Sequence, residues 1–148
     1  MSVAVHVSAE GVRLPLARER VSEIARRVLV AEGVREAMLS ITFLGTRAMA
    51  ALNKKHLGHG GATDVISFGF GESGRRGPVI GDIYIAPDVA RANARRHDAS
   101  VREELARLVV HGVLHVLGYD HEDGDARVAS PMWRRQERLL ALVEEARA

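Results

Sequence analysis

The segment 111–121 constrains the fold of this chain more than any other, because three of its histidines are spaced to meet at one point. His111 and His115 are four residues apart, which places them on the same face of a helix, one above the other. Gly118 follows them and is suited to end the helix in a left-handed turn. The turn would bring His121 back toward the first two imidazoles. The sequence therefore predicts a helix, a bend and three converging histidines.

Three converging imidazoles are the ligand set of an open, catalytic zinc-type site, in which the fourth position is left for water or substrate. The alternative is a helix that merely ends in histidines. The same spacing occurs in metzincin proteases, where a glutamate follows the first histidine and acts as the general base. Here that position is Gly112. The pattern therefore favours a metal held by His111, His115 and His121, and it argues against that protease chemistry.

The size and composition of the chain indicate one ordinary globular domain over residues 1–148. No apolar run reaches the ~18–20 residues of a membrane span, and the N-terminus lacks a signal-peptide pattern, so a cytoplasmic location is expected. The chain has no cysteine, which excludes a disulfide partner and thiolate metal ligands. The formal net charge of +2 is no strong nucleic-acid signature, so any basic surface must come from how the charges are arranged.

Hydrophobic periodicity and turn residues predict an α+β single domain, with a four-stranded mixed sheet packed against about five helices. Ser100 and Glu103 form a capping box that begins the histidine helix, and Ser130 with Pro131 begins the last one. A polar, glycine-rich flexible loop is expected at 54–61. The expected strands are 3–7, 38–44, 63–68 and 79–85, the last two as a hairpin, and the other expected helices are 16–32, 46–53 and 87–97.

These motifs together closely resemble the YbeY family of bacterial RNA-processing metalloproteins. The matching residues keep the family's order over nearly the whole chain; they are Asn53, 63–68, 81–83, 111–121 and the tail from Met132 to Glu137. The resemblance implies a mixed α+β fold and one zinc ion (Zn2+) per chain, held by His111, His115 and His121. It also implies a single-strand-specific endoribonuclease that acts in small-subunit ribosomal RNA maturation and ribosome quality control. Its partners would be single-stranded or ribosomal RNA and the small ribosomal subunit with its proteins.

The chain departs from the family pattern in one place. The family usually carries an arginine shortly after the asparagine that matches Asn53, with an assigned role in RNA cleavage, and Leu57 stands in its place here. A leucine cannot contact phosphate. Either neighbouring side chains of the same loop supply the positive charge, or this protein cleaves weakly. The candidates are Lys54, Lys55, His56 and His59.

The candidate catalytic residues are the metal ligand His111, together with Asp64 and Lys55. Asp64 and Asp82 are suited to proton transfer or to orienting a histidine, or they are ordinary cap or turn carboxylates. A phosphate-tracking surface could come from Lys54, Lys55, Arg75, Arg76, Arg95 and Arg96, although each taken singly is more typical of a solubilising charge. Two other functions stay open: a metal-dependent hydrolase of another bond, and a non-catalytic, zinc-stabilised ribosome-assembly factor.

Overall fold

The computed structural model describes residues 2–57, 63–70, 77–119 and 130–147. Strands and helices follow one another in the predicted order, and the prediction of an α+β domain with a four-stranded sheet is confirmed. The strands are β1 (Ser2–Glu10), β2 (Glu36–Leu44), β3 (Val65–Phe70) and β4 (Val79–Ile85). The helices are α1 (Arg18–Ala31), α2 (Thr46–Leu57), α3 (Pro87–Arg96), α4 (Val101–Val116) and α5 (Pro131–Arg147). No helix in these ranges is long and apolar enough to cross a membrane.

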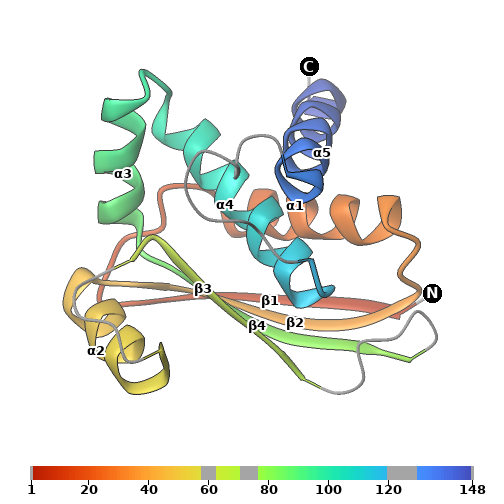
Figure 1. Ribbon diagram of the computed structural model, residues 1–148, viewed down its shortest axis with the longest axis horizontal. Coiled ribbons are helices and arrows are strands. Elements are labelled where there is room, and N and C mark those ends of the chain that lie inside the picture. The colour runs from red at the N-terminus through yellow and green to blue at the C-terminus, as the bar shows by residue number, and fades with distance from the viewer. Residues whose placement is uncertain (1, 58–62, 71–76, 120–129, 148) are drawn as a thin grey trace.

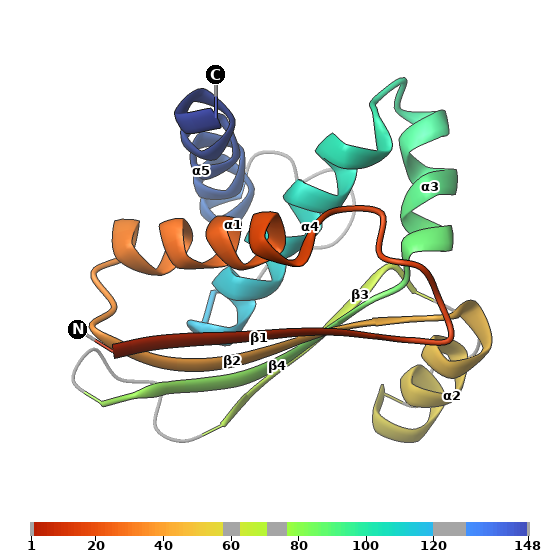
Figure 2. The ribbon, with the colours of Figure 1, turned by 180° about the vertical axis from the view of Figure 1, so that it is seen from behind.

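The sheet is mixed and has the strand order β1-β2-β4-β3. β2 pairs in parallel with both β1 and β4, whereas β3 and β4 form the predicted antiparallel pair. Helices α1, α4 and α5 lie over one face of the sheet, and α2 lies below one end of it (Figure 1 and, from behind, Figure 2). The histidine-bearing helix α4 packs on β3 and β4 and also contacts α1 and α5.

The main core lies between this covered face and the helices. Side chains alternate along a strand, so every second residue of β2 and β4 points toward α1 and α4. Leu39, Ile41 and Ile83 are at most 1% exposed, and Val109 and Val113 of α4 are fully buried against that layer. Because α4 is apolar on several sides, it is a central helix rather than a surface helix. Its histidines are consequently held by well-packed surroundings.

Helix α2 is longer than the sequence predicts. The polar segment that begins at Lys54 was expected to be a flexible loop, but the helix continues through Leu57. Lysine is a good helix former, and cations in a last turn interact favourably with the helix dipole. Lys54, Lys55 and His56 are exposed there, so these candidate cations stand on a helix. His59 and the rest of the expected loop, 58–61, lie outside the described residues.

Candidate metal centre

Helix α4 begins and ends as its sequence predicts. The Ser100 hydroxyl accepts a hydrogen bond from the backbone N–H of Glu103 at 3.0 Å. At the other end Gly118 has a φ of +102°, and the N–H of Tyr119 donates to the Leu114 carbonyl at 3.0 Å. The Gly118 N–H also donates to the His115 carbonyl, which completes a Schellman motif. The chain thus turns sharply three residues after His115, where the prediction requires it.

Three glycines let the second half of α4 lie close to β3 and β4. A Cβ atom on Gly112 would lie 2.8 Å from Cγ2 of Ile83, so the helix packs directly on a strand side chain. A Cβ on Gly81 would lie 2.5 Å from Cγ1 of Val116, and one on Gly69 would lie 3.1 Å from the Val116 carbonyl oxygen. These contacts fix the height of the histidines above the sheet. They also show that Gly112 faces the core, where a glutamate could not be placed without displacing Ile83.

Two of the three predicted metal ligands are brought together. The ring centroids of His111 and His115 are 4.7 Å apart, with an angle of 72° between the planes. His111 is buried, with 8% of its surface exposed, and His115 is half-buried. His121 lies outside the described residues, and within the part of the chain that the structure describes no group of three candidate ligands is found. Two adjacent imidazoles at the rim of a core fit a nitrogen-ligated divalent ion.

A chain of buried and half-buried polar groups connects His111 to helix α5. Nδ1 of His111 lies 2.6 Å from Oε1 of Gln136, which is only 2% exposed. The Gln136 side-chain amide donates to Oε2 of Glu137 at 3.1 Å, and Arg107 donates to both carboxylate oxygens of Glu137 at 3.0 and 3.2 Å. Arg107 also donates to Glu104 at 3.0 Å. No local pattern predicts these contacts, although Gln136 and Glu137 belong to the tail that resembles the YbeY family.

The electrostatics of this group depend on Arg107. Burial by itself lowers the pKa of the guanidinium, but hydrogen bonds to Glu137 and Glu104 and the charges of both carboxylates raise it by more. The net direction is upward, so the guanidinium stays charged and holds the Glu137 carboxylate at two points.

A second polar cluster holds the chain where it leaves α4. The Tyr119 hydroxyl donates to Glu32 at the end of α1, and Arg135 of α5 donates twice to the other oxygen of Glu32, at 2.8 and 2.6 Å. The hydrogen bond to Glu32, followed by burial, raises the pKa of the Tyr119 hydroxyl above its usual value. Tyr119 is the last described residue before the segment that contains His121. The cluster therefore anchors Tyr119 to α1 and α5.

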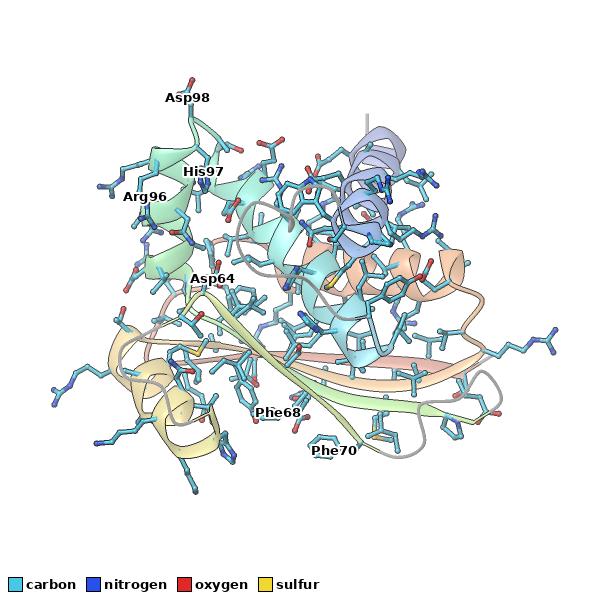
Figure 3. The ribbon with its side chains drawn as sticks, viewed as in Figure 1. Asp64, Phe68, Phe70, Arg96, His97 and Asp98 are labelled. Atoms are coloured by element: carbon cyan, nitrogen blue, oxygen red, sulfur yellow. The ribbon has the colours of Figure 1, made fainter. Side chains whose placement is uncertain are left out.

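The candidate carboxylates make contacts of their own. The Asp64 carboxylate accepts from the Asn93 side chain at 3.1 Å, and its carbonyl accepts from the Ala86 N–H at 2.9 Å, so it joins the beginning of β3 to α3 (Figure 3). The two neighbours of Asp82 in β4, Gly81 and Ile83, face α4. Because side chains alternate along a strand, the Asp82 side chain is on the other face of the sheet. A catalytic role for Asp64 stays a prediction.

The candidate cations lie on two helix ends. Lys55 is exposed in the last turn of α2, where the ring of neighbouring His56 packs edge-on against Phe68 at 5.2 Å between centroids. Arg95 and Arg96 are exposed in the last turn of α3. Arg96 donates to the side-chain oxygen of Asn93, and the amide nitrogen of the same Asn93 donates to Asp64 at 3.1 Å. Arg75 and Arg76 lie outside the described residues. Those candidate cations that the structure describes are thus divided between α2 and α3.

Comparison with known proteins identifies relatives over nearly the whole chain. The family model described as Endoribonuclease YbeY matches residues 6–144. A protein named Endoribonuclease YbeY from Anaeromyxobacter sp. (strain Fw109-5) is 41% identical over 126 residues, which are 84% of this chain and 66% of that protein. One of the same name from Syntrophus aciditrophicus (strain SB) is 32% identical over 148 residues, covering 97% of this chain and 90% of the relative.

The fold also has a solved counterpart. The solution structure of TM1509 from Thermotoga maritima superposes with a TM-score of 0.64 at 24% sequence identity. The match covers 97% of this chain and 91% of the other. At that identity the likeness concerns the fold alone, and it agrees with the mixed sheet and helix arrangement described above.

Proposed function

This chain belongs to the YbeY family of endoribonucleases, and on that premise we propose that it is a zinc-dependent endoribonuclease that cleaves single-stranded RNA. Its biological role in this proposal is the maturation of small-subunit ribosomal RNA and ribosome quality control in the cytoplasm. The proposed metal ligands are His111, His115 and His121, with one zinc ion per chain.

The observation that carries this proposal is the pair His111 and His115. Their imidazoles are adjacent, one is buried, and the helix that bears them is fixed at both ends and against the sheet. A bend of the predicted kind follows directly at Gly118. Such rigid support is what a site must have to keep ligands within about 0.5 Å of a productive geometry.

Different residues of the chain would have different roles in phosphodiester cleavage. A bound divalent ion supplies Lewis-acid stabilisation of the charge that grows on the phosphoryl oxygens, and it makes a water molecule more acidic. The exposed ammonium groups of Lys54 and Lys55 attract the RNA backbone to the end of α2. The buried surroundings of His111 exclude water on one side of the site, which strengthens electrostatic interactions there.

A cleavage assay with matched RNA substrates tests this proposal. Zinc-loaded wild type is expected to cut a single-stranded RNA and to leave the same sequence intact in a duplex. His115→Ala is expected to lose both zinc and cleavage, whereas Arg138→Ala, on the exposed side of α5, keeps both. Wild-type protein that holds zinc but cuts no RNA, under conditions in which a YbeY relative does, would overturn the enzymatic proposal.

A second function is favoured by one observation, the leucine at the position of the family's arginine. Leu57 is the last residue of α2, one turn after the exposed Lys54. If neighbouring cations do not replace the arginine, the protein acts as a zinc-stabilised ribosome-assembly factor without cleavage.

The variant Leu57→Arg separates the two functions. A gain in cleavage rate of at least about tenfold indicates that the natural leucine lowers the cleavage rate relative to arginine. An unchanged rate together with loss of activity in Lys55→Ala indicates that the neighbouring lysine has taken over the role. Complementation of cells that lack the gene by a zinc-binding, cleavage-inactive variant would favour the assembly factor.

A further inference from the structure

We infer that Gln136 is a positioning residue, whose side-chain carbonyl holds His111 in the tautomer that has its proton on Nδ1. The Nε2 atom then carries the lone pair, already directed, before any metal arrives. Nδ1 of His111 and Oε1 of Gln136 are 2.6 Å apart. Both side chains are buried: His111 is 8% exposed and Gln136 is 2% exposed. The inference rests on the proposed zinc site, but the contacts that carry it belong to the protein alone.

The direction of this hydrogen bond follows from the other partner of Gln136. Its Nε2 group donates to Oε2 of Glu137 at 3.1 Å. A carboxylate in an ion pair with a guanidinium can only accept hydrogen bonds, so the amide nitrogen must face Glu137 and the amide oxygen must face His111. An amide oxygen has no hydrogen to give. Nδ1 of His111 must therefore be the donor.

Arg107 keeps this orientation from reversing. Its guanidinium donates to both oxygens of Glu137 and to Glu104, which is 6% exposed on the same helix. Rotation of the Gln136 amide by half a turn would place its oxygen against the Glu137 carboxylate, which is repulsive. The protein thus fixes one tautomer through a continuous set of contacts that leaves α4, passes through α5 and returns to His111.

The consequence for a metal ion is an affinity effect. A metal-binding histidine whose second ring nitrogen donates to a carbonyl is oriented and made a more basic ligand. Loss of such a partner typically weakens metal binding about 10–100-fold. The alternative is that Gln136 merely satisfies a buried histidine. That role also places the proton on Nδ1, but it predicts no effect of Gln136 on zinc affinity, so the affinity measurement distinguishes the two readings.

Three variants of the full chain test the inference. Gln136→Met keeps the size and removes both hydrogen bonds. Glu137→Ala leaves the amide in place but frees it to rotate. Glu103→Ala is the matched control, because Glu103 is exposed and pairs with Arg107 only at 3.9 Å, and its removal leaves the hydrogen bonds from Arg107 to Glu137 and Glu104 in place. All four proteins are compared by thermal unfolding before the other measurements.

The first readout is the tautomer of His111 in metal-free protein, measured by ¹⁵N NMR at about pH 8, where an ordinary imidazole is neutral. The nitrogen that bears the proton resonates far from the one that carries the lone pair. Wild type and Glu103→Ala are expected to show the proton on Nδ1, and both other variants are expected to show a mixture.

The second readout is zinc affinity by competition with a chromophoric chelator. We expect Gln136→Met to bind about 10–100-fold more weakly, Glu137→Ala to be intermediate and Glu103→Ala to match wild type.

The outcomes separate this inference from the proposed function. If wild type binds no zinc, the zinc site fails, and the NMR measurement still decides the tautomer. The inference is overturned if Gln136→Met keeps the proton on Nδ1, or if it keeps wild-type zinc affinity. Should Gln136→Met fail to fold, Glu137→Ala decides: a single tautomer on Nδ1 in that variant contradicts the inference, and a mixture supports it.

Discussion

The substitution Gly81→Ala tests whether the contact between β4 and the end of α4 sets the position of His115. An alanine Cβ at this position would lie 2.5 and 2.8 Å from the two γ-methyl groups of Val116 and 3.0 Å from the Phe68 carbonyl oxygen. Carbon atoms in contact prefer about 3.5–4.0 Å, so the end of α4 must move away by roughly 1 Å. Because Val116 follows His115 directly, the imidazole is expected to move with it.

The cost follows from two opposing effects. Forcing an extra methyl group into a packed interior costs about 1–3 kcal/mol. Alanine is more favourable than glycine within a strand by about 0.5–1 kcal/mol, which offsets part of that cost. The net expectation is a free energy of unfolding lowered by about 1–2 kcal/mol. A displacement of roughly 1 Å also exceeds the tolerance of about 0.5 Å for a functional site, so zinc affinity should fall as well.

Urea unfolding of a double-mutant cycle measures the contact. Val116→Ala removes both methyl groups that the new Cβ would meet, so the double variant should be more stable than the sum of the single effects by about 1 kcal/mol or more. Gly77→Ala is the control, because a Cβ there meets nothing within 4 Å; its effect should stay within about 0.5 kcal/mol. Strict additivity of Gly81→Ala and Val116→Ala would refute the reasoning, since no shared contact would then exist.

Three further substitutions have defined outcomes. Tyr119→Phe removes the hydrogen bond to Glu32, which raises the pKa of Tyr119 in the folded protein. The contribution of this bond to stability is therefore present below about pH 10 and is lost as the pH rises through the raised pKa. The difference in the free energy of urea unfolding between wild type and variant should vanish at high pH. A constant difference up to pH 11 would contradict this. Ser100→Ala should lower stability by about 1 kcal/mol through loss of the helix cap, with zinc affinity unchanged. Gly118→Ala should cost about 1–2 kcal/mol, because its φ of +102° strains any side chain, and zinc affinity measured by chelator competition should fall with it.

The parts of the fold that depend on local signals were predictable. The capping residue Ser100, the C-terminal Gly118 and the cap at Ser130, which accepts from the Trp133 N–H at 3.1 Å, all act within a few residues of themselves. Runs of apolar and β-branched residues, which alternate clearly only in the first strand, likewise identified all four strands. The end of α2 was predicted wrongly, because the polar residues that begin at Lys54 are equally compatible with an exposed helical turn.

Contacts between distant segments were not predictable, because one sequence shows which residues are polar but not which of them meet. Arg18 and Arg26 donate to the carbonyl oxygens of Val7 and Val3 on the open edge of β1, at 2.7 and 2.6 Å, although their spacing indicates only an exposed face. The contact between His111 and Gln136 joins residues 25 positions apart on different helices. Such pairs depend on how the helices cross, which local periodicity does not determine.

X-ray absorption spectroscopy of the zinc-loaded protein tests the central claim most directly, because it counts the nitrogen ligands of the ion and measures their distances. The account predicts three imidazole nitrogens at about 2.0–2.1 Å in wild type, and two in each of His111→Ala, His115→Ala and His121→Ala where zinc is still held. A wild-type spectrum with two imidazoles or fewer, or one that His121→Ala leaves unchanged, would contradict it.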